Sequence, residues 1–187
     1  KNIRVISSGS RAEGLDLPGS DLDIMCLTDT YVVDEKQGNT QGKRLILDTD
    51  NALPGFALIR ITDDSFPVAN INDVTQTVDG LILNNNFFKQ SILEKLNGDC
   101  VCFGTTKTFN IDFKTLCKIH GPAVSTALNG IQEVDFVRCL PCREWPSIAK
   151  RWLLRNRCFQ WPSSDLMTEA IHEGVLLVPV GSKVSFF

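Results

Sequence analysis

Short β-prone runs separated by turn-forming residues fill the first two-thirds of the chain, whereas helical patterns fill the last third. We expect strands at residues 3–7, 22–27, 56–61 and 133–140, because each run is apolar or β-branched and is bounded by polar or turn-forming residues. Strands followed by helices are typical of an α+β or mixed α/β domain, in which helices cover a sheet. The pattern therefore predicts the α+β class.

The predicted helices carry start and stop signals. Residues 86–96 place their apolar side chains on one helical face. Two further helices begin at Trp145 and at Trp161, each followed by Pro and Ser, because proline is favoured at an early helical position. We expect the first to run to about Arg157 and the second to end at Gly174.

Two stretches between these elements have weaker patterns. Residues 29–55 are rich in Gly, Asn and Asp and predict a long surface excursion with a hairpin through residues 44–47. Residues 101–113 alternate apolar and polar side chains and predict one or two strands.

Composition narrows the class of protein. The chain has 187 residues, 43% of them hydrophobic, and a net charge of -3, which excludes a disordered chain and a wholly basic nucleic-acid-coating protein. The longest late apolar stretch, residues 175–180, is too short for a membrane span. Because the chain starts at Lys1 without an initiator Met or an apolar signal segment, we expect a fragment of a longer protein.

Seven cysteines bear on compartment and metal binding. An odd number of cysteines without a signal segment predicts reduced thiols in a cytoplasmic or nuclear protein. Cys139 and Cys142 have the spacing of half a zinc site, which would be completed by Cys100 and Cys102, by His120 or by His172. Since only one such closely spaced pair is present, we favour buried structural thiols.

The feature that carries chemistry is an acidic pair at the start of a predicted strand. Alternate residues of a strand point to one face, so Asp21 and Asp23 present two carboxylates side by side while Leu22 and Ile24 pack behind them. Two close carboxylates repel each other unless a cation lies between them. Oxygen ligands favour Mg²⁺ or Mn²⁺ over zinc.

A second motif precedes this pair. Gly9 and Ser10 follow the first predicted strand, where glycine allows close approach and backbone N–H groups and a hydroxyl can bind phosphate. A phosphate-binding turn beside a metal-binding acidic pair indicates phosphoryl or nucleotidyl transfer. Each motif alone is common, but their order along the chain makes the combination specific.

A two-metal site usually needs a third carboxylate. Asp135 is our candidate because it lies in an apolar β-prone run, where an unpartnered charge is costly. The alternative is that Asp135 faces solvent on an exposed sheet face, together with Glu133 and Arg138. Asp112 is a lesser candidate for the same role.

These motifs resemble those of the nucleotidyltransferase superfamily. The resemblance rests on two N-terminal motifs, Gly9-Ser10 and Asp21-Leu22-Asp23. Downstream blocks follow in order: His120-Gly121-Pro122-Ala123-Val124, Val134-Asp135-Phe136, Trp145-Pro146 and Leu177-Val178-Pro179. The downstream blocks are similar to those of Mab-21-like proteins, the group that includes cyclic GMP-AMP synthase and the cGAS-like receptors. The resemblance spans essentially the whole chain.

The resemblance implies a fold and an activity. Residues 1–187 would form a nucleotidyltransferase core, a twisted mixed sheet flanked by helices, incomplete at both ends and lacking the C-terminal helical lobe. Asp21, Asp23 and Asp135 would be the catalytic metal ligands, with Asp135 also assisting the attacking hydroxyl, and Gly9 and Ser10 would hold the triphosphate. Active relatives join ATP and/or GTP into a cyclic dinucleotide, usually after double-stranded RNA or DNA binds. Some Mab-21-like proteins have no known catalysis, so an inactive nucleotide-binding, nucleic-acid-binding or interaction protein is the alternative.

A basic cluster is the candidate contact for nucleic acid. On the predicted helix after Trp145, Arg151 and Arg155 lie one turn apart, and Lys150 and Arg157 are close by. Such a stripe contacts duplex phosphates in some proteins and is an ordinary solvated helix face in more of them. We find no Ser/His/Asp or Cys/His spacing that indicates a hydrolase.

Overall fold

The computed structural model describes residues 3–15, 17–28, 30–35, 44–63, 66–98, 117–128, 132–142, 144–157 and 161–181. The chain forms two compact units: Lys1–Leu27, Asn84–Cys139 and Val178–Phe187 make the first, and Thr28–Leu83 and Leu140–Leu177 make the second. Both are rich in strands and mix parallel with antiparallel pairing, with few helices. The predicted combination of a strand-rich sheet with helices is confirmed at this level.

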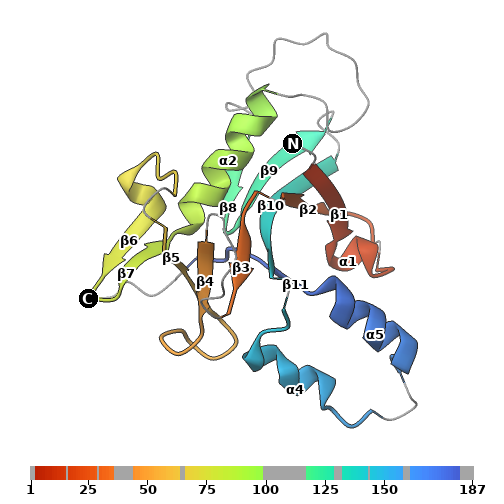
Figure 1. The fold of residues 1–187 in the computed structure, drawn as a ribbon. Helices are drawn as coiled ribbons and strands as arrows, with labels where there is room; N and C mark the ends of the chain where they lie inside the picture. The colour runs from red at the N-terminus through yellow and green to blue at the C-terminus, as the bar shows by residue number, and fades with distance from the viewer. Residues whose placement is uncertain are drawn as a thin grey trace. The chain divides into compact units, whose positions relative to one another are not determined.

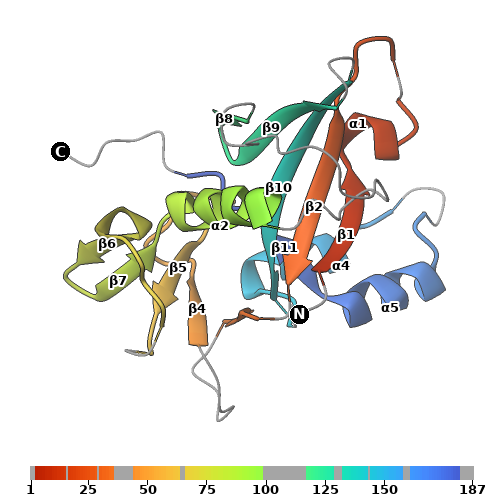
Figure 2. The same cartoon turned by 90° about the horizontal axis from the view of Figure 1, so that it is seen from above.

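The first unit contains five neighbouring strands (Figures 1 and 2). Their order is β1 (Ile3–Ser8), β2 (Leu22–Thr28), β10 (Gln132–Cys142), β9 (Ala123–Leu128) and β8 (Lys118–His120). β2 and β10 are parallel, whereas β9 is antiparallel to both β10 and β8. The strands predicted at residues 3–7, 22–27 and 133–140 are therefore confirmed.

One face of this sheet forms the hydrophobic core. Ile24, Val124, Val134 and Phe136 are buried there with Ile92 of helix α2 (Asn85–Gly98), which was predicted at residues 86–96. Because side chains alternate along a strand, the residues between these core positions point to the opposite face. That opposite face carries Asp23 and Asp135.

A tight hairpin joins β8 to β9. His120 pairs with Ala123, so Gly121 and Pro122 form a two-residue loop, and Gly121 has a φ of +56°. A positive φ at the first loop position followed by the fixed negative φ of proline matches a type II′ turn. The strands predicted at residues 101–113 lie outside the described residues.

The second unit has its own mixed sheet. β3 (Val32–Asp34) pairs in parallel with β4 (Arg44–Asp48), and the order continues with antiparallel β5 (Leu58–Ile61), β7 (Gly80–Leu83) and β6 (Val74–Thr77), which follows a 3-10 turn, η1 (Ile71–Asp73). The expected hairpin at residues 44–47 takes the form of β4 paired with β5, but the predicted surface excursion is wrong here, because Val33, Leu45 and Leu47 are buried in the core. β11 (Val175–Leu177) pairs with the last residues of β10.

The helices of the second unit are shorter than predicted. A 3-10 turn, η2 (Ser147–Ala149), leads into α4 (Lys150–Leu153), which ends four residues before Arg157. Arg157 donates hydrogen bonds to the carbonyl oxygens of Trp152 (2.6 Å) and Leu153 (3.4 Å), which satisfies acceptors that a longer helix would have used. The prediction of a helix to Arg157 is therefore wrong.

The last helix ends where predicted, at Gly174, but begins at Ser164, three residues after the predicted start at Trp161, so Pro162 lies outside it. In α5 (Ser164–Glu173) the Ser163 hydroxyl accepts a hydrogen bond from the Leu166 N–H at 3.3 Å, and Gly174 ends the helix with a φ of +79°. Within the described part of the chain, we find no helix of the length and apolarity that crossing a membrane requires.

A partly buried ion pair lies in the second sheet, and it gives a first testable prediction. The Arg60 Nε lies 2.6 Å from the Asp48 Oδ2, and the two side chains are only 16% and 10% exposed. Burial alone would raise the pKa of the Asp48 carboxyl, but hydrogen bonds from Asn51 and Arg60 lower it below 3.8. The carboxylate therefore contributes stability above about pH 4, and this contribution is lost as the pH falls through the lowered folded pKa.

Asp48→Ala is expected to reduce the free energy of unfolding at pH 7 by about 1–2 kcal/mol, because it removes the nearer carboxylate and leaves the Arg60 guanidinium with only the exposed Asp79 as a partner. Urea denaturation measures this, with Asp50→Ala as the matched control, since Asp50 is an exposed acid two residues away. Equal losses in the two variants would show that the ion pair does not carry the stability.

Candidate metal centre

The structure brings the three predicted carboxylates together. Asp135 on β10 pairs directly with Asp23 on the parallel strand β2, and Asp21 immediately precedes β2. All three side chains are half-buried, and their ligand oxygens lie within 4.8 Å of one another. Residues from two separate parts of the sequence thus form one acidic cluster of the size that surrounds a metal ion.

The electrostatics of the cluster favour a bound cation. Partial burial raises the pKa of the Asp23 carboxyl, and the negative charges of Asp21 and Asp135 raise it further. A divalent cation would compensate the same repulsion, because it is the largest local positive charge in such a site. The donor set consists of carboxylate oxygens, which suits a hard ion such as Mg²⁺ or Mn²⁺.

Gly9 lies directly against this cluster. It follows β1, has a φ of +71° and begins the short helix α1 (Gly9–Ala12). A β-carbon added at Gly9 would overlap the Oδ2 of Asp23, so only glycine fits without displacing that carboxylate. Ser10, the other predicted phosphate contact, is exposed next to it.

Two residues that sequence reasoning missed continue the cluster across the sheet. Asp135 pairs with Ser125 on β9, and Ser125 pairs with Lys118 on β8. Directly paired residues point to the same face, so Asp23, Asp135, Ser125 and Lys118 form a row over four neighbouring strands. The Gly-Pro turn at residues 121–122 was the available signal, since it marks a hairpin and thereby places these strands together.

The alternative for Asp135, an exposed face shared with Glu133 and Arg138, is only partly right. Glu133 shares the face and is exposed, but Arg138 is 6% exposed and lies on the opposite face. There its guanidinium lies 5.8 Å from the centre of the Phe87 ring. Arg138 therefore does not indicate an exposed surface around Asp135. Asp112, the lesser candidate for the third carboxylate, lies outside the described residues.

The cysteine and histidine candidates do not form a metal site in the described part of the chain. Cys139 and Cys142 are buried, and burial raises their thiol pKa values to about 12 and about 11, respectively. They are three residues apart on one strand and so point to opposite faces, which prevents them from binding one zinc ion together. His120, the last residue of β8, and His172, on α5, are exposed; Cys100 and Cys102 lie outside the described residues.

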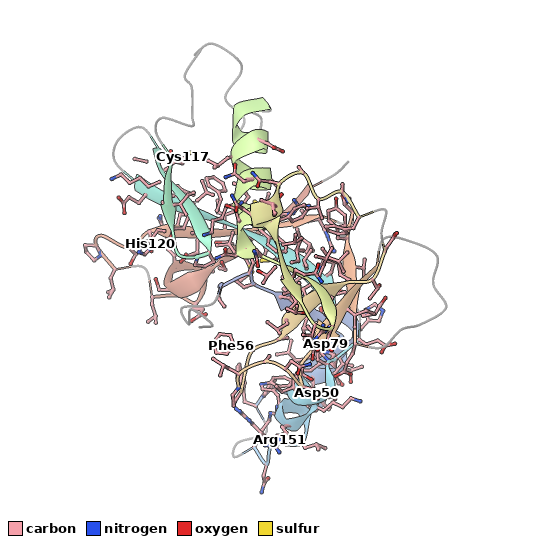
Figure 3. The ribbon with its side chains drawn as sticks, turned by 90° about the vertical axis from the view of Figure 1, so that its left-hand side faces the viewer. Asp50, Phe56, Asp79, Cys117, His120 and Arg151 are labelled. Carbon is pink, nitrogen blue, oxygen red and sulfur yellow. The ribbon has the colours of Figure 1, made fainter. Side chains whose placement is uncertain are left out.

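The four basic residues predicted to contact nucleic acid differ in exposure and do not lie on one helix. Lys150 and Arg151 are exposed on α4, and Arg155 is exposed beyond its end, so Arg151 and Arg155 do not share a helical face. Arg157 lies 4.5 Å from the Trp152 ring centre and bonds backbone carbonyls, so its guanidinium is engaged within the protein. Arg151, which is labelled in Figure 3, and Lys150 are the exposed basic residues of the cluster on this helix.

The second unit also contains an open cavity of about 660 Å³. Its walls include Asp48, Asp50 and Asp79, of which the last two are labelled in Figure 3, together with Arg60. The Arg60 guanidinium lies 2.5 Å from the Asp48 carboxylate and 3.4 Å from that of Asp79, so its charge is already compensated. The carboxylates of Asp21, Asp23 and Asp135 do not line this cavity.

Comparison with known proteins adds no assignment. No protein-family model matches the chain, and no curated protein matches it either.

Proposed function

We propose that the protein is a metal-dependent nucleotidyltransferase with a nucleotidyltransferase core like that of the cGAS-like receptors. The observation that supports this most is the convergence of Asp21, Asp23 and Asp135 within 4.8 Å, beside the Gly9 turn. Three carboxylates next to a turn that suits phosphate are what transfer of a nucleotidyl group requires.

Each residue has a role in the proposed reaction. Asp21 and Asp23 hold Mg²⁺ or Mn²⁺, which supplies electrostatic stabilisation to the transferring phosphoryl group. Gly9 and Ser10 hold the triphosphate of the donor nucleotide. A hydroxyl of the acceptor forms a bond to the α-phosphorus, the bond to pyrophosphate breaks, and Asp135 accepts the hydroxyl proton.

The nature of the product follows from the resemblance in the sequence motifs. We propose ATP and/or GTP as substrates, a cyclic dinucleotide as product and double-stranded RNA or DNA as the activator. Arg151 and Arg155 are the proposed duplex contacts, because both are exposed. If they contact phosphates, binding weakens with salt and the double variant Arg151→Glu/Arg155→Glu reduces it.

The test is incubation of the full-length protein with ATP, GTP and Mg²⁺ or Mn²⁺, with and without double-stranded RNA and DNA. We expect pyrophosphate release together with a dinucleotide product, identified by mass spectrometry. Nucleotide binding without product under every condition would favour the inactive Mab-21-like alternative. Absence of both binding and product would contradict the proposal altogether.

A further inference from the structure

The paired residues across the sheet of the first unit place the groups of the candidate site in a fixed order. From β1 towards β8 it runs through Gly9, Asp23, Asp135, Ser125 and Lys118. Gly9 and the carboxylates of Asp21 and Asp23 lie at one end, and Asp135 lies in the middle. This order restricts where two reactants can lie.

The donor and the acceptor must lie on different sides of Asp135. In the proposed reaction the donor phosphates lie over Gly9 and Asp23, on the β1 side of the row. The acceptor hydroxyl lies at Asp135. Because the donor lies on the β1 side, the rest of the acceptor extends to the other side, over β9 and β8. Ser125 and Lys118 are the side chains that it meets there.

We infer that Ser125 and Lys118 form the acceptor side of the site and that Lys118 selects an acceptor carrying phosphate groups. This inference rests on the proposed function. Neighbouring strands are about 4.8 Å apart, so the Lys118 backbone lies about 10 Å from that of Asp135. Its flexible four-carbon side chain can place the ammonium group on a polyphosphate attached to an acceptor nucleoside.

The surroundings of Lys118 support this role. Its side chain is exposed, and no carboxylate among the described residues lies within ion-pairing distance of it. Ser125 is half-buried between Lys118 and Asp135, where its hydroxyl can donate a hydrogen bond to the same acceptor. Among the described residues β8 pairs only with β9, and a lysine on such an edge strand also protects the edge from pairing with other chains, which is a different explanation for its presence.

Steady-state kinetics with separate donor and acceptor test the inference. A 2′,3′-dideoxynucleoside triphosphate serves as donor only, and the acceptor is offered either as an α,β-methylene nucleoside triphosphate, which cannot act as a donor, or as the matching nucleoside. For Lys118→Met we expect the KM of the triphosphate acceptor to rise about tenfold, the size of one lost charged contact. The KM of the donor and of the nucleoside acceptor should not change, and Lys118→Arg should restore the triphosphate KM.

Lys89→Met is the matched control, since Lys89 lies on α2 of the same unit and is not in the row. Calorimetric titration of the metal-loaded protein with nucleotide gives a readout that does not require turnover. Weakening of one of two nucleotide-binding events by Lys118→Met would support the inference even if the wild type formed no product. An active wild type with unchanged acceptor KM and unchanged nucleotide binding in Lys118→Met would overturn the inference. Aggregation of Lys118→Met with unaltered nucleotide affinity would also overturn it, because that result would show that Lys118 protects the strand edge and does not bind the acceptor.

Discussion

Asp23→Asn is expected to lower kcat by about 1,000-fold or more, because the carboxylate within 4.8 Å of those of Asp21 and Asp135 would no longer hold a cation. Mn²⁺ binding, followed by electron paramagnetic resonance, should weaken in parallel. The same variant should raise the melting temperature of the metal-free protein at pH 7, since it removes one of three mutually repelling charges. The combination of lower activity and higher metal-free stability is specific to a site built for a cation.

The sign of the stability effect follows from the raised pKa of Asp23. A carboxyl that holds its proton more tightly in the folded state stabilises the fold most at low pH. That contribution is lost as the pH rises from 3.8, its ordinary value, through the raised folded pKa. Glu133→Gln is the matched control, because Glu133 is an exposed acid on the same face of β10. If Glu133→Gln and Asp23→Asn gave the same activity and melting temperature, the cluster would have no special role.

Gly9→Ala is expected to reduce metal affinity and kcat by about 100-fold and to lower the free energy of unfolding by about 1–2 kcal/mol, because alanine is strained at a φ of +71°. The added methyl group would overlap the Asp23 carboxylate and displace it from the other two ligands. Misplacing a reacting group by about 1 Å is enough for a loss of this size. Enzyme assays and Mn²⁺ titration of the variant measure both effects.

Gly14→Ala separates this clash from backbone strain. Gly14 also has a positive φ, of +84°, but a β-carbon there would have no neighbour within 4 Å. Both variants therefore incur the same kind of conformational cost, and only Gly9→Ala disturbs Asp23. Similar metal affinities in the two variants would refute the assigned role of Gly9.

The acidic cluster could be predicted because it depends on local patterns. Strand alternation places Asp21 and Asp23 on one face whatever the rest of the fold, and the apolar run around Asp135 signals a charge that needs a partner. The Gly9 turn was predictable for the same reason. What could not be derived locally was the parallel register of β2 and β10 that puts Asp23 opposite Asp135.

Other features depend on contacts between distant residues or on short elements. The row from Asp135 to Ser125 and Lys118 exists only because β8, β9 and β10 pair in one particular register. β8 has three residues, too few for a periodic pattern. The helix after Trp145 ends early because the Arg157 side chain bonds its last carbonyls, an effect that helix propensity does not encode.

The most direct measurement is a crystal structure of the protein grown with Mn²⁺ and a 2′,3′-dideoxynucleoside triphosphate, with anomalous data collected to locate the ions. We predict manganese within about 2.0–2.3 Å of carboxylate oxygens from Asp21, Asp23 and Asp135, with the nucleotide phosphates beside Gly9 and Ser10. Manganese bound elsewhere, or an Asp135 side chain turned away from ions held by Asp21 and Asp23, would contradict the central claim.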